Sequence, residues 1–452
     1  MSGADRRPNG LVRLVGGAAA VKVGVMVMSG LLGIVTSRLI LSSFGTQAYA
    51  QYGLLSTITT LLPFADLGIA AVLINTLASS DDPRRDEHVR RTLTTAIRVL
   101  LCSGAIIIAV GAGITVAGLW PALLGNGLVP GTGSLAAFLC LAIFGLVLPL
   151  GVGSRILVGL QRNTTQLAVS AVVAPFILIV IGSAVLLAVP LGGYLAVVSY
   201  AANALSSVIC VLLAARLISP QLREAIRDVP RIRSVPGVKM MNTAWPMLVQ
   251  LLALPVAMQT DRLLLSHLTT GDQLAQYNLA SQFFGIILQT VAAAGLALWP
   301  IYARARASSE VRSPNGPTAA FALGGLGLGA VLALISPWLV DVVSAGRLQL
   351  DGWLVWGFVA FATVQAAKYP IGMYMTDGRG LRFQVVPILI LVPINLGLSW
   401  WLVGVIGAGG TIIGSTISVV LCQVVPNLLY VRRDLRRRRA QVLAPEDDVL
   451  VG

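Results

Sequence analysis

The heptapeptide Thr36-Ser-Arg-Leu-Ile-Leu-Ser42 recurs at 260–266 as Thr-Asp-Arg-Leu-Leu-Leu-Ser, with five of seven positions identical. A second pair follows each copy. Residues 50–56 are Ala-Gln-Tyr-Gly-Leu-Leu-Ser, and residues 275–281 are Ala-Gln-Tyr-Asn-Leu-Ala-Ser. Both pairs lie where one apolar stretch ends and the next begins. We therefore interpret the chain as two halves with a common architecture.

The composition is that of a membrane protein. Of 452 residues, 56% are hydrophobic and 11% are charged, whereas soluble domains carry about 25% charged residues. So few charges cannot cover the surface of a soluble protein of this size, which excludes soluble domains, a disordered chain and a disulfide scaffold. The four cysteines lie singly within apolar runs, so we expect buried thiols and no metal or redox site.

Twelve apolar runs are long enough to cross a bilayer as a helix, which takes about 20 residues. They lie at residues 15–41, 48–77, 93–119, 135–158, 166–189, 193–216, 239–267, 274–302, 317–340, 353–375, 384–406 and 409–431. Only short loops and two tails remain, and no loop can hold a folded enzyme domain. The sequence predicts an all-α polytopic membrane protein with about twelve transmembrane helices.

The repeat also predicts how these helices are grouped. Because six is even, both halves start on the same side of the membrane and form two parallel-related six-helix bundles around a central cavity, as in transporters. The predicted organisation is a tail at 1–14, bundles at 15–217 and 238–431, a linker at 218–237 and a basic tail at 432–452. Gly325-x-x-x-Gly329 and Gly410-x-x-x-Gly414 predict close helix packing.

The basic residues predict the orientation. With the N-terminus inside, 27 of the 32 Lys and Arg residues lie on the inner side, and the outer loops hold only Arg347. This asymmetry is the positive-inside pattern, so both termini are predicted to be cytoplasmic. The Arg-rich run at 432–439 either sets orientation alone or also contacts anionic membrane lipids. The net charge of +14 is therefore explained by topology, and no nucleic-acid partner is expected.

Six charged residues remain within the predicted spans, where each costs about 2.5–3.5 kcal/mol at the bilayer centre. They are Lys22, Arg38, Asp66, Asp261, Arg262 and Lys368. Such residues usually face a bundle interior or a wet cavity. Lys22 and Lys368 are candidates for lining an inward-facing cavity, with the alternative that their stems extend to the inner surface.

The repeat relates Arg38 to Arg262, and the Arg guanidinium offers a fork of donors that suits phosphate. A structural role, as a helix-end cap or as a partner of Asp261, is the alternative. Asp66 and Asp261 are candidates either for coupling Na⁺ or H⁺ or for structural pairing. No Gly-x-Ser-x-Gly, Walker A or HExxH motif occurs, so the sequence predicts no enzyme, no catalytic residue and no bound metal.

Two stretches carry a family resemblance. Thr36–Gly53 with Ala65-Asp-Leu-Gly-Ile69, and Gln259–Leu265 with Tyr277 and Trp299-Pro-Ile-Tyr302, resemble the polysaccharide-biosynthesis flippases. These are the O-antigen and capsule repeat-unit translocases of the multidrug/oligosaccharidyl-lipid/polysaccharide exporter superfamily. The resemblance implies alternating access of a cationic cavity and transfer of an oligosaccharide on polyprenyl pyrophosphate to the outer leaflet of a bacterial cytoplasmic membrane.

The resemblance also implies candidate contacts and partners. By position, Lys22, Arg38 and Arg262 are candidates for the pyrophosphate, and glycan polymerases or ligases are the expected protein partners. A multidrug cation antiporter of the same superfamily is the alternative, but it favours acidic cavity residues, and the charges within the spans are four basic and two acidic. A membrane glycosyltransferase or polymerase needs long outer loops, which are missing here.

Overall fold

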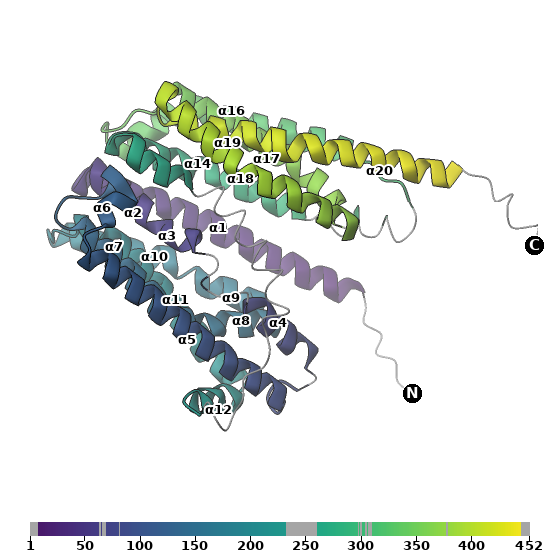
Figure 1. Ribbon diagram of the computed structural model, residues 1–452, viewed down its shortest axis with the longest axis horizontal. Helices are drawn as coiled ribbons and strands as arrows, with labels where there is room; N and C mark the ends of the chain where they lie inside the picture. Colours follow the sequence, from purple (N-terminus) through teal and green to yellow (C-terminus); the bar gives the residue numbers. More distant parts are fainter. Residues whose placement is uncertain are drawn as a thin grey trace, which may run out of the picture. The chain divides into compact units, whose positions relative to one another are not determined.

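The computed structural model describes residues 8–62, 65, 69–80, 82–231, 260–296, 298, 301, 302, 305, 310–376 and 378–443. Within these ranges the regular structure is helical throughout. The chain divides into two compact units (Figure 1). The first comprises Met1–Pro255 and Val343–Arg347, and the second comprises Val256–Val342 and Leu348–Gly452.

The first unit is a bundle that starts with the long helix α1 and ends with the short helix α12. In chain order its helices are α1 (Pro8–Phe44), α2 (Thr46–Ser56), α3 (Ile58–Leu61), α4 (Ile69–Ser79), α5 (Glu87–Val116), α6 (Trp120–Leu124), α7 (Gly133–Val147), α8 (Gly151–Gly159), α9 (Asn163–Ser170), α10 (Val173–Leu186), α11 (Leu195–Leu217) and α12 (Gln221–Asp228). Helix α11 packs against α7, α8 and α10, so it is central to this bundle.

In the second unit, a helical segment at 260–268 precedes six labelled α-helices and a π-helical turn. The order is α14 (Gly271–Leu296), α16 (Asn315–Ser344), α17 (Gly352–Tyr374), α18 (Gly378–Ile406), α19 (Gly409–Val419), the π-turn η5 (Val420–Val424) and α20 (Val425–Leu443). Helix α17 packs against α14 and α19, and α19 also packs against α18.

All twelve predicted spans contain helix, which confirms the helical prediction for their described residues. For the span at 239–267, only residues 260–267 lie within the described ranges. Seven described helices are long and apolar enough to cross a membrane. The second predicted span, 48–77, is divided into α2, α3 and α4 rather than being one continuous helix.

Proline marks two other interruptions. Pro149 lies in a 3₁₀ turn, Leu148–Leu150, between α7 and α8. Pro175 follows the break between α9 and α10. Proline has no N–H to donate, and its ring clashes with the carbonyl four residues earlier, so a helix breaks or bends there. The turn at Pro149 directly follows the α7 residues that line the cavity described below.

The predicted close-packing glycines are confirmed. A Cβ on Gly325 would come within 2.8 Å of Ala366 Cβ, and one on Gly329 within 3.3 Å of Val359 Cγ1, so both glycines face α17. A Cβ on Gly410 would overlap the backbone of Leu402 and Val403 in α18. Small residues let two helix backbones approach closely in a membrane.

We expect Gly410→Ala to destabilise the second unit by about 1–3 kcal/mol, the usual cost of overpacking, because the methyl group meets backbone rather than a movable side chain. The measurement is thermal unfolding of the purified protein. Gly404→Ala is the control, since its Cβ meets nothing within 4 Å, and an alanine in a helix interior is favoured over glycine. Equal melting temperatures for the two variants would contradict the packing assigned to Gly410.

The first part of the predicted linker is a folded helix. Helix α12 packs against α5, and Leu222 and Ala225 are buried in the core of the first unit. Arg98 of α5 donates from Nη2 to the Asp228 carbonyl oxygen at 2.6 Å and from Nε to the Val229 carbonyl oxygen at 2.8 Å. These donors satisfy carbonyls at the C-terminal end of α12, which lack partners within the helix.

Helix α20 is held at its basic end. The Tyr374 hydroxyl donates to Asp434 Oδ2 at 2.7 Å, and Arg438 Nε donates to the same oxygen at 2.7 Å. Val431 and Leu435 are buried beside Ile371 of α17. Of the cysteines, Cys140, Cys210 and Cys422 are buried as predicted, but Cys102 is exposed. An apolar run in a membrane protein includes positions on the outside of the bundle, and burial within protein does not follow from it.

Candidate functional site

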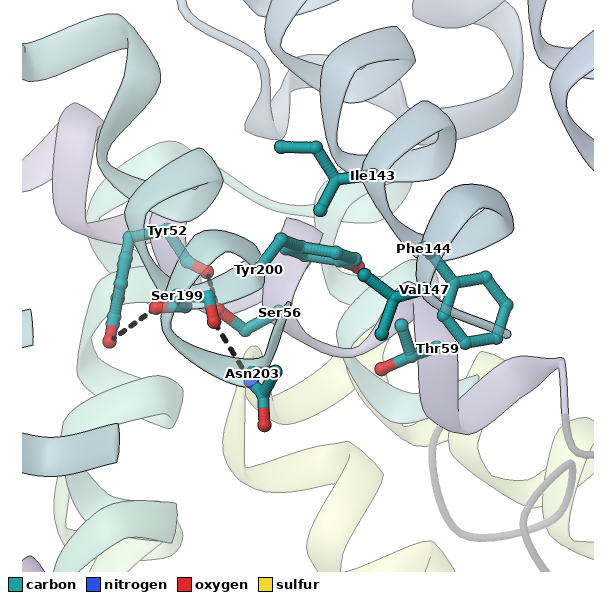
Figure 2. A pocket seen from close by; sticks show the side chains of 9 residues that line it. All are labelled: Tyr52, Ser56, Thr59, Ile143, Phe144, Val147, Ser199, Tyr200 and Asn203. Carbon is teal, nitrogen blue, oxygen red and sulfur yellow. Dashed lines mark hydrogen bonds between the residues drawn. The ribbon is translucent and has the colours of Figure 1, made fainter. Parts of the chain in front are cut away.

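A cavity of about 380 Å³ lies within the first unit, between α2 and α3 on one side and α7 and α11 on the other (Figure 2). Six of its nine lining side chains carry a hydroxyl or an amide, three are apolar and none is charged. They are Tyr52, Ser56, Thr59, Ile143, Phe144, Val147, Ser199, Tyr200 and Asn203. The polar residues come from α2, α3 and α11, and the three apolar residues come from α7.

Helical spacing places the lining side chains of α2 and α7. Tyr52 and Ser56 are one turn apart on α2, and Thr59 follows on α3. Ile143 and Phe144 each lie about one turn before Val147 on α7, so these three share a face. Ser199, Tyr200 and Asn203 provide the contribution of α11.

Hydrogen bonds fix the polar side chains. Ser199 Oγ donates to the Tyr52 hydroxyl at 3.2 Å, and Ser56 Oγ donates to the Tyr52 carbonyl oxygen at 2.6 Å. The Tyr200 hydroxyl donates to the Leu55 carbonyl oxygen at 2.8 Å, and Asn203 Nδ2 donates to the Ser199 carbonyl oxygen at 2.8 Å. The Tyr52 hydroxyl accepts in this network, so its own proton can be offered to a ligand.

A second cavity, of about 160 Å³, adjoins the first and shares Phe144 and Val147 with it. Its lining is mostly apolar and includes the charged side chain of Arg155 from α8 and the hydroxyl of Ser207 from α11. Phe144 and Val147 thus line both an uncharged polar cavity and a smaller cavity that holds a cationic side chain.

The second unit holds a buried carboxylate. Asp261 is only 3% exposed. The Tyr277 hydroxyl donates to its Oδ2 at 3.0 Å, and Ser415 Oγ of α19 donates to the same oxygen at 3.2 Å. Asp261 therefore has two hydroxyl partners from two different helices, which compensates part of the cost of burying a polar group.

In both units, hydrogen-bonded tyrosine and serine residues occupy equivalent positions of the sequence repeat. Tyr52 and Tyr277 are equivalent positions of the repeated Ala-Gln-Tyr motif, and Ser199 and Ser415 each lie six residues after a glycine in the last span of their half. Each tyrosine thus belongs to a hydrogen-bonded group that includes a serine of that last span. Asp261 occupies the position of Ser37, whose Oγ donates to the Tyr49 hydroxyl at 3.3 Å.

The predicted cationic residues have different surroundings. Arg262 is half-buried, and its Nη2 donates to Ser281 Oγ of α14 at 2.7 Å. Arg38 of α1 is exposed, and Lys368 of α17 is half-buried. Arg38 belongs to the first unit, whereas Arg262 and Lys368 belong to the second.

The structure brings Asp261 and Arg262 together against one face of α14, through Tyr277 and Ser281 one turn apart. Lys22 lies in α1, but its side chain is outside the described residues, as is Asp66. Among the residues that the structure describes, no three His, Cys, Asp or Glu side chains gather as metal ligands.

The uncharged cavity was missed by sequence reasoning, although Tyr52 and Ser56 lie in the quoted repeat. In an apolar span, charged residues are the most conspicuous candidates, whereas a serine or asparagine is easily assigned to helix packing. The available signal was the recurrence of glycine and serine six residues apart in the sixth and twelfth predicted spans.

Comparison with known proteins identifies the sequence family and the fold. The sequence model of the family described as polysaccharide biosynthesis protein matches residues 18–306. No curated protein sequence matches the chain. Among solved structures, an inward-facing multidrug resistance MATE family transporter of the MOP superfamily is similar, with a TM-score of 0.64 at 16% identity over 93% of this chain and 99% of that one.

The lipid II flippase MurJ in an inward closed conformation is similarly related, with a TM-score of 0.63 at 12% identity over 93% of this chain and 90% of that one. A MATE protein in the bent conformation has a TM-score of 0.57 at 14% identity, with 95% and 97% of the two chains covered. The fold is therefore that of the MOP-superfamily transporters. The chain itself belongs to the polysaccharide biosynthesis protein family.

These findings confirm the predicted all-α polytopic fold class and the predicted family. The chain is a multi-pass membrane protein, and its fold is shared with solved transporter structures.

Proposed function

We propose that this protein moves an oligosaccharide linked to polyprenyl pyrophosphate from the inner to the outer leaflet of a bacterial cytoplasmic membrane, for cell-surface polysaccharide biosynthesis. The observation that carries the proposal is the uncharged, hydroxyl-lined cavity of the first unit, in a chain of the polysaccharide biosynthesis family. Such a lining suits a polyhydroxylated cargo, and a cationic drug would favour a carboxylate there. The protein thereby acts as a carrier and not as an enzyme.

In the proposed mechanism, basic side chains hold the anionic pyrophosphate while the glycan crosses in polar surroundings and the lipid tail stays in the bilayer. Lys22, Arg38, Arg262 and Lys368 are the proposed pyrophosphate contacts. Arg262 supports this role best, because it is half-buried and its guanidinium is oriented by Ser281. A guanidinium is a forked donor that matches phosphate oxygens. Alternating access then exposes the cargo to each side of the membrane in turn.

Asp261 is the proposed coupling residue for Na⁺ or H⁺. The hydroxyls of Tyr277 and Ser415 donate to its carboxylate. A hydroxyl has two acceptor lone pairs as well as a proton and can rotate, so the same two oxygens can turn toward a bound Na⁺. Cation binding would then reorganise contacts that join the 260–268 helix, α14 and α19. Asp66 is a second proposed coupling or pairing residue.

The proposed orientation has both termini in the cytoplasm. On α20, Arg432, Arg433, Arg436 and Arg437 are exposed, whereas Leu435 is buried. Basic residues just beyond a membrane span are attracted to anionic lipids by about 1 kcal/mol each. This exposed face supports a contact with anionic lipids of the inner leaflet. Glycan polymerases or ligases that consume the transferred lipid are the proposed functional partners.

Deletion of the gene tests the proposal. We expect lipid-linked glycan to accumulate on the inner leaflet and surface polysaccharide to fall, with both restored by the wild-type gene. The measurement is mass spectrometry of extracted lipid-linked glycans, combined with glycosidase- and lectin-accessibility of the glycan in oriented vesicles. No accumulation, together with increased sensitivity to cationic drugs, would instead favour a multidrug antiporter; multidrug resistance is the role named for a similar MATE structure.

A further inference from the structure

We infer that the cavity of the first unit is a binding subsite for a single uncharged sugar ring, with Asn203 as its specificity-determining residue. The inference rests on the proposed function. It specifies where one sugar of the cargo is held and which side chains contact it. Its basis is the lining of the cavity, whose polar side chains come from α2, α3 and α11 and whose apolar side chains come from α7 (Figure 2).

The chemistry of the lining matches a sugar ring. A pyranose has hydroxyls around its edge and apolar C–H groups on its faces, so it needs hydrogen-bonding groups on one side and an apolar surface on the other. The hydroxyls of Tyr52, Ser56 and Thr59 provide the first, and Phe144 and Val147 provide the second. The cavity volume of about 380 Å³ lies at the lower end of the range for small-molecule sites, about 300–1,000 Å³.

The absence of charge in the nine lining residues decides the class of ligand. A carboxylate of an acidic sugar or the ammonium group of a drug would meet no opposite charge among these nine residues to compensate for the water that it gives up. A neutral sugar exchanges water for the protein hydroxyls at much lower cost. The pyrophosphate therefore belongs outside this cavity, on a basic side chain.

Asn203 is the group best suited to select among sugars. One N–H of its side chain is used, in the hydrogen bond to the Ser199 carbonyl oxygen. The second N–H and the carbonyl oxygen remain, so one planar group can donate to one sugar hydroxyl and accept from its neighbour. Ser199 is in turn bonded to Tyr52, which fixes the amide relative to the proton that Tyr52 can donate.

The test measures binding to the full-length protein in nanodiscs. The probes are farnesyl pyrophosphate and its esters carrying a single glucose, galactose, N-acetylglucosamine or N-acetylgalactosamine. We expect the wild type to bind at least one sugar ester about tenfold or more tightly than bare farnesyl pyrophosphate, as one or two net hydrogen bonds allow. Asn203→Leu should abolish this preference and leave the affinity for bare farnesyl pyrophosphate unchanged.

Ser206→Leu is the matched control, because it replaces a polar residue with leucine on the same helix but outside both cavities, and it should keep the preference. A positional readout uses Asn203→Cys in a Cys102→Ser background, which removes the exposed native thiol. The sugar ester should protect this cysteine from a maleimide, whereas bare farnesyl pyrophosphate should not.

The outcomes separate the subsite from the proposed function. A preference that survives Asn203→Leu, or equal wild-type affinity for the bare and sugar-bearing probes, would overturn the subsite and leave the proposed function standing. Failure of the wild type to bind any of the probes would overturn the proposed function and the subsite together. Loss of preference in Asn203→Leu, retained in Ser206→Leu, supports both.

Discussion

Replacing Asp261 with asparagine is expected to abolish the response of the protein to its coupling cation and to lower transport by about tenfold or more. Coupling free energies between two sites are typically about 1–3 kcal/mol, which corresponds to about 5–150-fold. The amide keeps the size of the side chain but removes the negative charge that a cation needs. Its NH₂ group also faces a hydroxyl that now donates to the carboxylate.

The measurement is transport in proteoliposomes with imposed Na⁺ or H⁺ gradients, together with the melting temperature in NaCl and in choline chloride. A cation that binds the folded state stabilises it according to its concentration relative to its dissociation constant. We expect a cation-dependent shift in the wild type and none in Asp261→Asn. Asp341→Asn is the control, because Asp341 is exposed on α16 of the same unit.

Two results would give Asp261 a structural role instead. One is an unchanged gradient dependence in Asp261→Asn. The other is a melting temperature lowered equally in both salts, with normal transport per folded molecule. Tyr277→Phe refines the test, because it removes one hydroxyl donor and leaves the charge in place.

Replacing Arg262 with alanine is expected to weaken binding of farnesyl pyrophosphate by about tenfold or more, while farnesol binding is unchanged. Hydrogen bonds to charged groups contribute about 1.5–3 kcal/mol, enough for a loss of that size. Arg262→Lys should recover only part of the affinity, because a lysine keeps the charge but loses the forked geometry. Binding to the protein in nanodiscs is the measurement.

Ser281→Ala separates the two explanations of Arg262. This variant removes the hydrogen bond that Arg262 makes to α14 and keeps the cation available. Near-normal binding in Ser281→Ala supports a pyrophosphate contact. Equal losses of binding and of melting temperature in Arg262→Ala and Ser281→Ala would show that Arg262 serves helix packing, and would remove it from the proposed site.

The fold was largely predictable because membrane helices are recognised by their length and hydrophobicity. Each predicted span contains helix in its described part. Interruptions within spans are harder to predict. The break between α2 and α3 at Thr57, for example, is not preceded by a nearby proline. Helix α12 was assigned to a linker because its basic residues and flanking prolines suggested one. Helix α12 is held by Arg90 and Arg98 of α5, which lie more than 100 residues earlier in the chain. Sequence patterns alone do not show such a long-range pairing.

Charged candidates were the easiest part of the site to find and the hardest to place. The energetic cost of a charge in a bilayer singles out Asp261 and Arg262 in the sequence, but their partners Ser415 and Ser281 become visible only in three dimensions. The uncharged cavity has the opposite character. Its asparagine and hydroxyls cost little individually, and only their convergence from three segments of the chain makes a site.

The repeated tyrosine and serine positions of the two units bear on the descent of the chain. Ser199 bonds Tyr52 directly, whereas Tyr277 and Ser415 both bond Asp261, and the two pairs occupy matching places in the two halves, as duplication of an ancestral half predicts. The difference between Ser37 and Asp261 arose afterwards. In evolutionary terms, the two copies came to differ in charge at this position, with a hydroxyl in one half and a carboxylate in the other.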